Sequence, residues 1–426
     1  MAGKSISSLE DFKKSVESAG HKNLAGKAEV KANESAFSEM KAHIGGLYKG
    51  VTEVHSFEDE NGSIFDCIPV NQQPSLKGAS PAQAPDLPAM HKPSGPAGEA
   101  VGDRHPHEIA ITFKEGKKDK HGNAMTCPAG HIPMRRITLE EMTRFESMRQ
   151  FFQKSPHGEG RPPKTKGNPT AVLSETSAPA VAATHRWAHA YQNVNNLGGH
   201  SYLNVWDPAI GANQIFSLSQ HWYVGGSGAG LQTAECGWQV YPGKYNTKLP
   251  VFFIYWTADD YNKTGCYNLD CSAFVQTNHS VTIGGTLSPS SVYGGAQYEI
   301  QLSYYLYQGN WWLYWGGGAA SNAIGYYPTS LYKGGAMASH ASEIDYGGET
   351  VGTTSFPPMG SGHFASEGWT KACYQRDITY FPTGGGQVNA SLTPSVAWPK
   401  CYTATVTLYA TPWFETEFFG GPGGSC

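Results

Sequence analysis

Four carboxylates in the second half of the chain occupy positions from which they could act together. Glu235 lies in a run that alternates like a β-strand. Glu343, Asp345 and Glu349 share the same parity along another predicted strand, so all three could face one groove. Two glycines precede Glu349, and glycine allows a second backbone to approach closely. Two carboxyl groups held together cannot both ionise cheaply, so such a pair can supply a general base and a general acid.

A simpler interpretation of Glu235, taken alone, is a solvated carboxylate on the face of a sheet. If a groove does surround a carboxylate pair, we expect amide and aromatic side chains to line it. The candidates are Gln239, Trp238, Tyr255, Trp256 and Asp345, the last also being the alternative to Glu349. Most Trp and Tyr residues of such a chain would instead belong to the core or to the sheet surface.

The elements that position these residues are predicted to be short strands. The chain contains 51 Gly, 23 Tyr, 18 Phe and 11 Trp, a composition that favours turns and pleated surfaces. After residue 185 the pattern predicts an all-β domain, an antiparallel β-sandwich resembling a jelly roll, with one short helix near 328–340. The predicted strands include 200–206, 214–219, 251–256, 280–283, 298–307 and 402–409.

The first half of the chain predicts a smaller mixed α/β region. A capped helix starts near Ser8, and two strands flank a turn at Glu60-Asn61-Gly62. Further along we expect a Pro-rich linker or wrapping arm over 79–98, a strand over 107–114 and a helix over 137–152. Residues 154–184 are rich in Pro and Gly and predict the main domain boundary, where proteolytic nicking concentrates.

Charge is distributed unevenly between the two halves. From His185 onward there are 8 Lys or Arg and 13 Asp or Glu in 242 residues, against 23 and 22 in the 184 residues before it. A sparsely charged domain changes its self-repulsion little when carboxylates protonate, which suits work in acid. The net charge of -4 and the lack of a basic run with aromatics argue against nucleic acid as a partner. No run approaches the roughly 20 apolar residues of a membrane span, and the N-terminus lacks the apolar core of a signal peptide.

Other kinds of site are not favoured. The sequence has no Cys-x-x-Cys and no His-Glu-x-x-His, so we expect neither a metal nor a cofactor. Ser361, in Gly360-Ser361-Gly362-His363, lacks the Gly-x-Ser-x-Gly elbow of a serine hydrolase.

Many short strings, in order, make the chain similar to the neprosin family of glutamic peptidases. Residues 63–67 and 127–136 resemble the activation peptide of that family. The strings in the second half are 216–222, 233–240, 255–261, 264–271, 274–277, 310–313, 346–349, 359–364 and 419–423.

The resemblance implies a β-sandwich endopeptidase that is made as a zymogen, uses two glutamates, needs no metal and cuts after proline in acid. Carried onto this sequence, the catalytic pair is Glu235 and Glu349. The division implied is an N-terminal extension (1–49), a pro-domain (50–153), a linker (154–184) and a catalytic domain (185–426). The family also implies secretion, and proline-containing peptides or proteins as substrates.

The same resemblance implies an activation scheme. The N-terminal region would fold back as an intramolecular inhibitor, and acid would weaken that contact by protonating carboxylates. Cleavage in the linker would then release it. An enzyme that cuts after proline could cleave its own linker at any of five prolines, Pro156, Pro162, Pro163, Pro169 and Pro179.

The eight cysteines permit four disulfides. The family pairs the equivalents of Cys266 with Cys271 and of Cys401 with Cys426. The family has a small residue where Cys236 and Cys373 stand, so we expect these two to form an additional bridge. Cys67 and Cys127 remain and would pair within the activation peptide, or else be buried free thiols.

Two other functions stay open from the sequence. The domain could be a non-catalytic sandwich that binds extended peptide or carbohydrate in an aromatic groove. It could also cleave peptides without a preference for proline.

Overall fold

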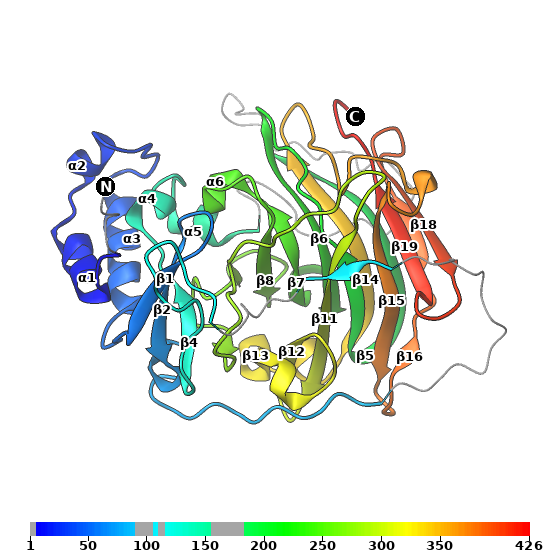
Figure 1. Ribbon diagram of the computed structural model, residues 1–426, viewed down its shortest axis with the longest axis horizontal. Coiled ribbons are helices and arrows are strands. Elements are labelled where there is room, and N and C mark those ends of the chain that lie inside the picture. The colour runs from blue at the N-terminus through cyan, green and yellow to red at the C-terminus, as the bar shows by residue number, and fades with distance from the viewer. Residues whose placement is uncertain (1–5, 90–104, 110–115, 155–182) are drawn as a thin grey trace.

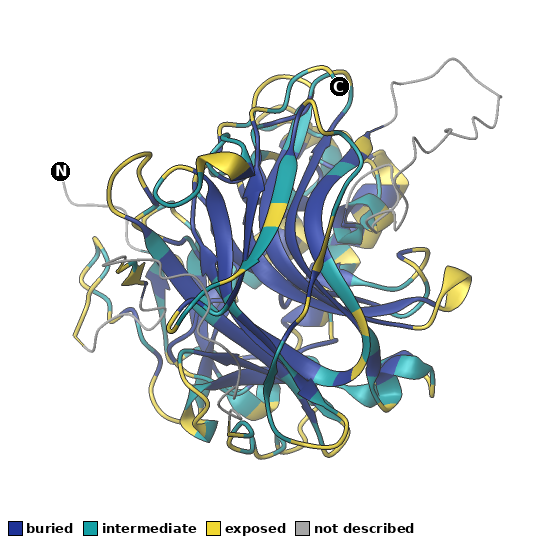
Figure 2. Ribbon diagram, turned by 90° about the vertical axis from the view of Figure 1, so that its right-hand side faces the viewer, coloured by how far each residue is buried: buried dark blue, intermediate teal, exposed yellow. Residues whose placement is uncertain are grey.

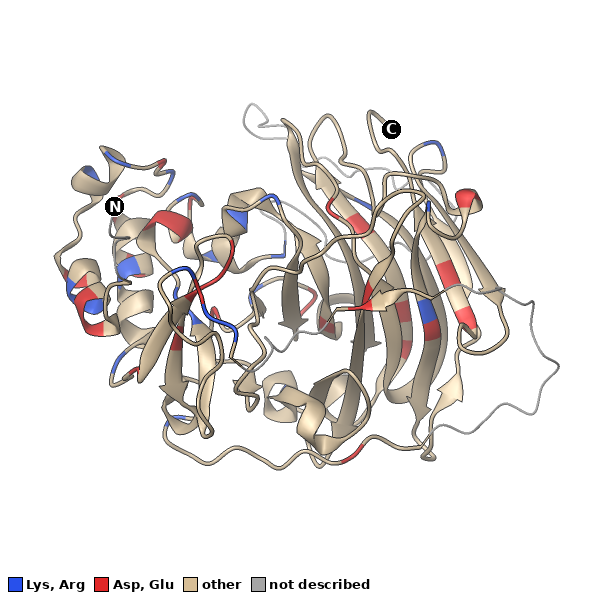
Figure 3. Cartoon of the chain, in the orientation of Figure 1, with Lys and Arg blue, Asp and Glu red and all other residues tan. Residues whose placement is uncertain are grey.

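The computed structural model describes residues 6–89, 105–109, 116–154 and 183–426. A small N-terminal region of helices and a three-stranded sheet lies beside a large, strongly curved β-structure (Figure 1). Figure 3 shows that most of the large β-structure carries neither positive nor negative side chains, in agreement with the uneven charge of the sequence. Among the described residues, no helix combines the length and apolar character needed to cross a bilayer.

The N-terminal region is built from α1 (Leu9–Ser18), α2 (His21–Ala25) and α3 (Glu34–Leu47). Ser8 caps α1, as predicted, because its hydroxyl accepts a hydrogen bond from the Asp11 amide at 3.0 Å. Next to these helices lies the antiparallel sheet β1–β2–β4. Its strands are β1 (His55–Glu58), β2 (Ile64–Pro69) and β4 (His131–Arg135), so the predicted pair of strands within residues 50–70 is confirmed.

Two antiparallel layers form the large β-structure. The first layer runs in the order β5–β14–β6–β7–β8–β9 and the second in the order β11–β12–β13–β10. The bounds are β5 Thr184–Asn204, β6 Gln214–Gly225, β7 Gln232–Val240, β8 Val251–Thr257, β9 Cys266–Tyr267, β10 Val275–Gln276, β11 Tyr298–Tyr307, β12 Asn310–Trp315, β13 Ala323–Pro328 and β14 Ala341–Gly352.

The long strand β5 connects the layers. Its first part pairs with β14 and its last part, from Gly198, pairs with β11. On its other side it pairs with β15 (Cys373–Pro382) and β17 (Thr393–Val396). The remaining strands are β3 (His107–Glu108), β16 (Val388–Asn389), β18 (Thr403–Leu408) and β19 (Glu415–Gly420).

Aromatic side chains fill the space between the layers. The Tyr223 ring of β6 lies 5.7 Å from Tyr304 of β11 and 6.3 Å from Trp311 of β12. The Trp238 indole of β7 donates to the Asn204 carbonyl oxygen at 2.9 Å. Figure 2 shows the central strands buried along their length. Two sheets that bury their facing side chains against each other confirm the antiparallel β-sandwich.

Three predicted elements differ in the structure. The helix over 137–152 is broken into α4 (Leu139–Met142) and α5 (Met148–Phe152), because Ser147 caps a new helix by accepting from the Gln150 amide at 3.2 Å. The region 328–340 holds two 3₁₀ turns, Thr329–Tyr332 and Ala336–Ala338, instead of an α-helix. Residues 280–283 form no strand and lead into a turn at 283–284. In the predicted strand over 107–114, only 107–108 pair in β3, and 110–114 lie outside the described residues.

Three of the four expected disulfides form. They are Cys67–Cys127, Cys266–Cys271 and Cys401–Cys426. Three bridges are typical of a protein that folds in an oxidising compartment.

The expected Cys236–Cys373 bridge is wrong, because both thiols are free and buried. The Cys373 sulfur contacts the Asn204 carbonyl oxygen at 3.6 Å, and the Trp238 indole binds that same oxygen. The Trp238 side chain and the Cys373 thiol therefore meet at Asn204, and Cys373 has Trp238 rather than Cys236 as its neighbour from β7 at this oxygen.

Candidate active site

Both predicted catalytic glutamates lie on one face of the first layer. In the register of the sheet, Glu235 of β7 is opposite Trp222 of β6, and Glu349 of β14 is opposite Leu218 of β6. Directly paired residues of neighbouring antiparallel strands point to the same side. Glu235 and Glu349 therefore face the same way with a single strand, β6, between their own strands.

The row between the two glutamates is nearly free of side chains. It consists of Gly237, Gln220 and Gly347 on three adjacent strands, and each glutamate stands two residues away from it, on opposite sides. A Cβ atom on Gly237 would lie 2.0 Å from the Ser219 carbonyl oxygen, and Gly347 has a positive φ of 132°. Both positions therefore require glycine, and the two glycines leave space between the carboxylates.

A lysine from the N-terminal half fills that space. The Lys154 amine donates to Oε2 of Glu235 at 2.6 Å and lies 3.0 Å from Oε2 of Glu349. The second contact is an ion pair that lacks hydrogen-bond geometry. The side chains of all three residues are 0–1% exposed. One buried cation thus joins the two carboxylates.

Three neutral donors hold the carboxylate of Glu235. Oε1 accepts from the Tyr261 hydroxyl at 2.6 Å and from the Thr233 hydroxyl at 2.7 Å. Oε2 accepts from the Gln220 amide at 3.1 Å as well as from Lys154. Because each donor sits on the sheet or on the turn after β8, the orientation of this carboxylate is fixed by the fold.

Glu349 has a different environment. Its Oε1 pairs with Nδ1 of His185, the second residue of β5. Burial by itself would raise the pKa of Glu349, but the Lys154 ammonium and the His185 imidazole outweigh burial and lower the pKa below its ordinary value of 4.5. In this state of the protein Glu349 is therefore a charged, buried carboxylate.

The backbone of the segment that carries Lys154 is bound by side chains beside Glu235, and we call the surface that they form the groove. The carbonyl oxygen of Phe152 accepts from the Tyr255 hydroxyl at 3.1 Å, and that of Lys154 accepts from the Tyr267 hydroxyl at 2.8 Å. The carbonyl oxygen of Phe151 accepts from the Lys244 amine at 3.2 Å. Side chains of the groove thus bind a peptide backbone and not only one side chain.

The predicted groove residues divide into two sets. Gln239 and Tyr255 lie on the face of Glu235, and the Gln239 amide donates to the Tyr267 hydroxyl at 3.2 Å. The prediction was wrong for Trp238 and Trp256, which stand at odd spacing from Glu235 and Tyr255 and point into the sandwich. The Trp256 ring lies there 6.4 Å from that of Tyr327.

The alternative carboxylate, Asp345, lies on the correct face but apart from Lys154. Its Oδ1 is 2.7 Å from Nδ1 of His189, and both side chains are buried. Glu349, and not Asp345, shares the cation with Glu235 in this structure.

Five residues of the site were not predicted from the sequence. Gln220, Thr233 and Tyr261 lie inside strings that carried the family resemblance, so those strings contained a usable signal. His185 could have been found as an imidazole at the start of the all-β half. Lys154 carries no such signal, because its position in the groove depends on how the two halves of the chain meet.

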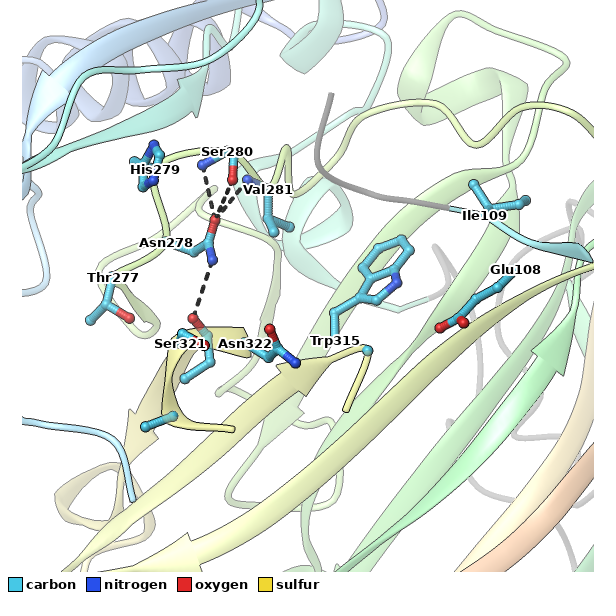
Figure 4. A pocket seen from close by; sticks show the side chains of 13 residues that line it. Glu108, Ile109, Thr277, Asn278, His279, Ser280, Val281, Trp315, Ser321 and Asn322 are labelled. Carbon is cyan, nitrogen blue, oxygen red and sulfur yellow. Dashed lines mark hydrogen bonds between the residues drawn. The ribbon is translucent and has the colours of Figure 1, made fainter. Parts of the chain in front are cut away.

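Other candidate sites hold no comparable arrangement. The Ser361 hydroxyl accepts from the His363 amide at 3.2 Å, while the His363 ring pairs with Glu367 at 2.9 Å, so they form no nucleophile and base pair. Figure 4 shows a separate cavity of about 530 Å³ beside Trp315 and Asn278, whose only described carboxylate is Glu108. Within the described ranges no group of three or more His, Cys, Asp or Glu is arranged to hold a metal.

The described chain thus combines an antiparallel β-sandwich with two buried glutamates on one face. Comparison with protein families matches residues 213–422 to the neprosin family, and over that stretch the chain belongs to it. The matched stretch includes both glutamates.

Solved structures of glutamic peptidases are also similar to this chain. Scytalido-glutamic peptidase with a transition state analog inhibitor is 11% identical, with a TM-score of 0.32, and the match covers 56% of this chain and 99% of that one. SCP-B, a member of the eqolisin family of peptidases in complex with the tripeptide Ala-Ile-His, is 10% identical, with a TM-score of 0.30 and the same coverage.

Proposed function

We propose that this protein is a glutamic endopeptidase in its latent form, with Glu235 and Glu349 as the catalytic pair. The single observation that carries the proposal is the Lys154 amine, which lies within 3.0 Å of both carboxylates. A cation buried between two glutamates offsets their repulsion. Without it, one carboxyl would keep its proton, and the pair would hold one base and one acid.

The position of the amine also supports a mechanism. A water molecule in the place of the Lys154 nitrogen would be within hydrogen-bonding distance of both carboxylates. The ionised carboxylate accepts a proton from this water as its oxygen attacks the peptide carbonyl, and the protonated carboxyl donates its proton to the leaving amine. The Gln220 amide, between the two strands, supplies a neutral donor to the oxygen that becomes negative.

The backbone contacts of residues 151–154 support a peptide substrate. Tyr255, Tyr267 and Lys244 donate to three carbonyl oxygens of this segment. A substrate chain would present carbonyls to the same donors once the segment has left. Latency then follows from occupation of the groove by the N-terminal half, as in the division 1–49, 50–153, 154–184 and 185–426.

Activation in acid follows from the charges around Lys154, which blocks the space between Glu235 and Glu349. Protonation of Glu349 removes its attraction for Lys154, and cleavage in the linker then makes release irreversible. The linker residues 155–182, with the five candidate prolines, lie outside the described residues. Cleavage after proline and secretion remain parts of the proposal that rest on the family, with the three disulfides in support of secretion.

The test is to incubate the purified chain at about pH 3 and about pH 7 and to map both its new N-terminus and the products of a proline-containing peptide. We expect acid-dependent cuts after proline and a new terminus between Lys154 and Thr184. An intact peptide at every pH, although the N-terminal region has been removed, would leave a non-catalytic peptide-binding sandwich as the better description.

A further inference from the structure

The outer face of the second layer carries an aromatic surface that is hidden from solvent. Trp312 and Tyr314 of β12, Tyr326 of β13 and Val275 of β10 alternate with inward residues such as Trp311, so they point away from the sandwich interior. On the outside of a sheet these side chains would be expected to contact water. Instead Trp312 is 1% exposed and Tyr314 is 0% exposed. We call these four residues the aromatic face.

The aromatic face is covered by a segment of the N-terminal half. Residues 79–89 form an extended arm without helix or strand, and the arm runs below β13 and β12 along the lower edge of the molecule in Figure 1. Leu76, Ala82, Ala84 and Leu87 pack against the face. Of the two structures expected for the Pro-rich region, a linker and a wrapping arm, the described part is a wrapping arm.

Hydrogen bonds fix the arm at four points. The Tyr314 hydroxyl donates to the Pro85 carbonyl oxygen at 2.7 Å, and the Ala82 amide donates to the Tyr326 hydroxyl at 3.0 Å. The Leu87 amide donates to the Gly318 carbonyl oxygen, and the Asp86 carboxylate accepts from the Ala320 amide, both at 2.7 Å. Two tyrosine hydroxyls thus form hydrogen bonds with backbone groups of the arm.

The chemistry of the arm defines what the face binds. The arm carries Pro81, Pro85 and Pro88 at intervals of three or four residues. Proline-rich chains adopt an extended helix whose carbonyls have no internal partner, and aromatic grooves with hydroxyl or indole donors recognise such chains. The Trp312 indole N–H is buried and has no partner among the described residues, so a donor remains for a further carbonyl.

We propose that the aromatic face is a docking site for extended, proline-rich polypeptide, separate from the catalytic groove. The inference rests on the proposed function in one respect, since release of residues 1–154 would remove the arm and bare the face. A bared patch of Trp and Tyr is the kind of surface that marks a binding site. The aromatic face lies on the outside of the second layer, whereas Glu235 lies on the first layer. One long substrate can therefore bind at both sites, and binding to the aromatic face raises the effective concentration of its cleavable segment at the groove.

Binding, and not cleavage, tests this site. The protein used is the full chain with Glu235→Gln, so that it does not cleave the probe, and with residues 79–89 replaced by a Gly/Ser sequence of equal length. The probe is a synthetic peptide of residues 79–89. We expect saturable binding in a tryptophan fluorescence titration, at least about tenfold tighter than to the chain with its own arm. Replacing the three prolines of the peptide by alanine, or Tyr314→Phe in the protein, weakens binding by about fivefold or more.

Absence of binding to the folded, arm-replaced chain would overturn the inference, as would equal binding of the peptide without prolines. Self-association of that chain in sedimentation, without peptide binding, would show that the face instead pairs with a second copy. If arm replacement prevents folding, Asp86→Ala with Leu87→Gly removes one side-chain hydrogen bond and the packing of the Leu87 side chain but leaves the prolines, and the same titration applies. None of these readouts uses peptidase activity, so failure of the proposed function would leave them unchanged.

Discussion

Glu235 and Glu349 lie on one face of the β-sandwich with a single strand between their own strands, and they share one buried amine, that of Lys154. Each carboxylate has its own second set of contacts, neutral donors for Glu235 and an imidazole for Glu349. The two glutamates thus border one small space but have different surroundings. A pair in which one carboxyl acts as a base and the other as an acid needs such different surroundings.

Replacement of Lys154 by methionine is expected to open the latent form. Lys154→Met leaves two buried carboxylates without their cation, and loss of one partner from a buried ion pair costs about 3–5 kcal/mol. We expect a lower melting temperature at neutral pH and faster release of the N-terminal region in acid. Thermal unfolding and gel analysis of the timed acid reaction measure both.

The control for this change is Lys248→Met, which removes an exposed lysine from the same sandwich and should alter stability by less than about 0.5 kcal/mol. If Lys154→Met and Lys248→Met had equal stability and equal latency, Lys154 would not be the residue that holds the N-terminal region on the catalytic pair.

Stability of the latent form is expected to fall in acid because of Glu349. Its pKa is lowered in the folded chain, so the carboxylate contributes stability above its ordinary pKa of 4.5, and that contribution is lost as the pH falls through the lowered pKa. Thermal unfolding of the wild type and of Glu349→Gln, measured from neutral to acid pH, isolates the effect. The difference between the two should be large at neutral pH and shrink below about pH 4.5; a constant difference would refute it.

Tyr261→Phe tests how Glu235 is held. The change removes a hydroxyl that donates to Oε1 at 2.6 Å but leaves the ring in place. We expect kcat to fall by about tenfold or more with little change in KM, because the hydrogen bond orients a catalytic group and does not bind substrate. The matched control is Tyr409→Phe, a half-buried tyrosine remote from the groove. A rise in KM alone would assign Tyr261 to substrate binding instead.

The two free cysteines are expected to be unreactive in the folded protein. Burial, with a further contribution from Glu235 for Cys236 and from Glu417 for Cys373, raises the pKa of both thiols well above the ordinary value. A thiol reagent should therefore label none of the folded chain and two cysteines per chain in denaturant without reductant. A linked peptide that contains both Cys236 and Cys373 would contradict this arrangement.

Strand parity predicted a large part of the site. It placed Glu343, Asp345 and Glu349 on one face, and the register of β14 confirms this. The same parity, applied from Glu235, would have excluded Trp238 from the groove, three residues further along the strand. The break between α4 and α5 was also visible in part, since Ser147 is a capping residue inside the apolar stripe.

Other features depend on distances that a single sequence does not contain. Lys154 meets Glu235 across 81 residues of chain, and only the docking of the two halves brings them together. The Cys236–Cys373 pair is predicted from the residue types, but both thiols are free, and Cys373 contacts the Asn204 carbonyl oxygen that also binds the Trp238 indole. Local pattern gives faces and ends of elements, whereas long-range packing decides which faces meet.

The most direct test of the central claim compares Glu235→Gln and Glu349→Gln with the wild type on one proline-containing peptide in acid. The N-terminal region is first removed from each chain by an added protease. The control is Glu417→Gln, a buried glutamate on another strand whose pKa burial raises well above the ordinary value, so that it is already neutral. We predict that each of the first two changes lowers kcat by at least about 100-fold in a folded protein while the control retains activity. Undiminished cleavage by either Glu235→Gln or Glu349→Gln would contradict the assignment of the pair.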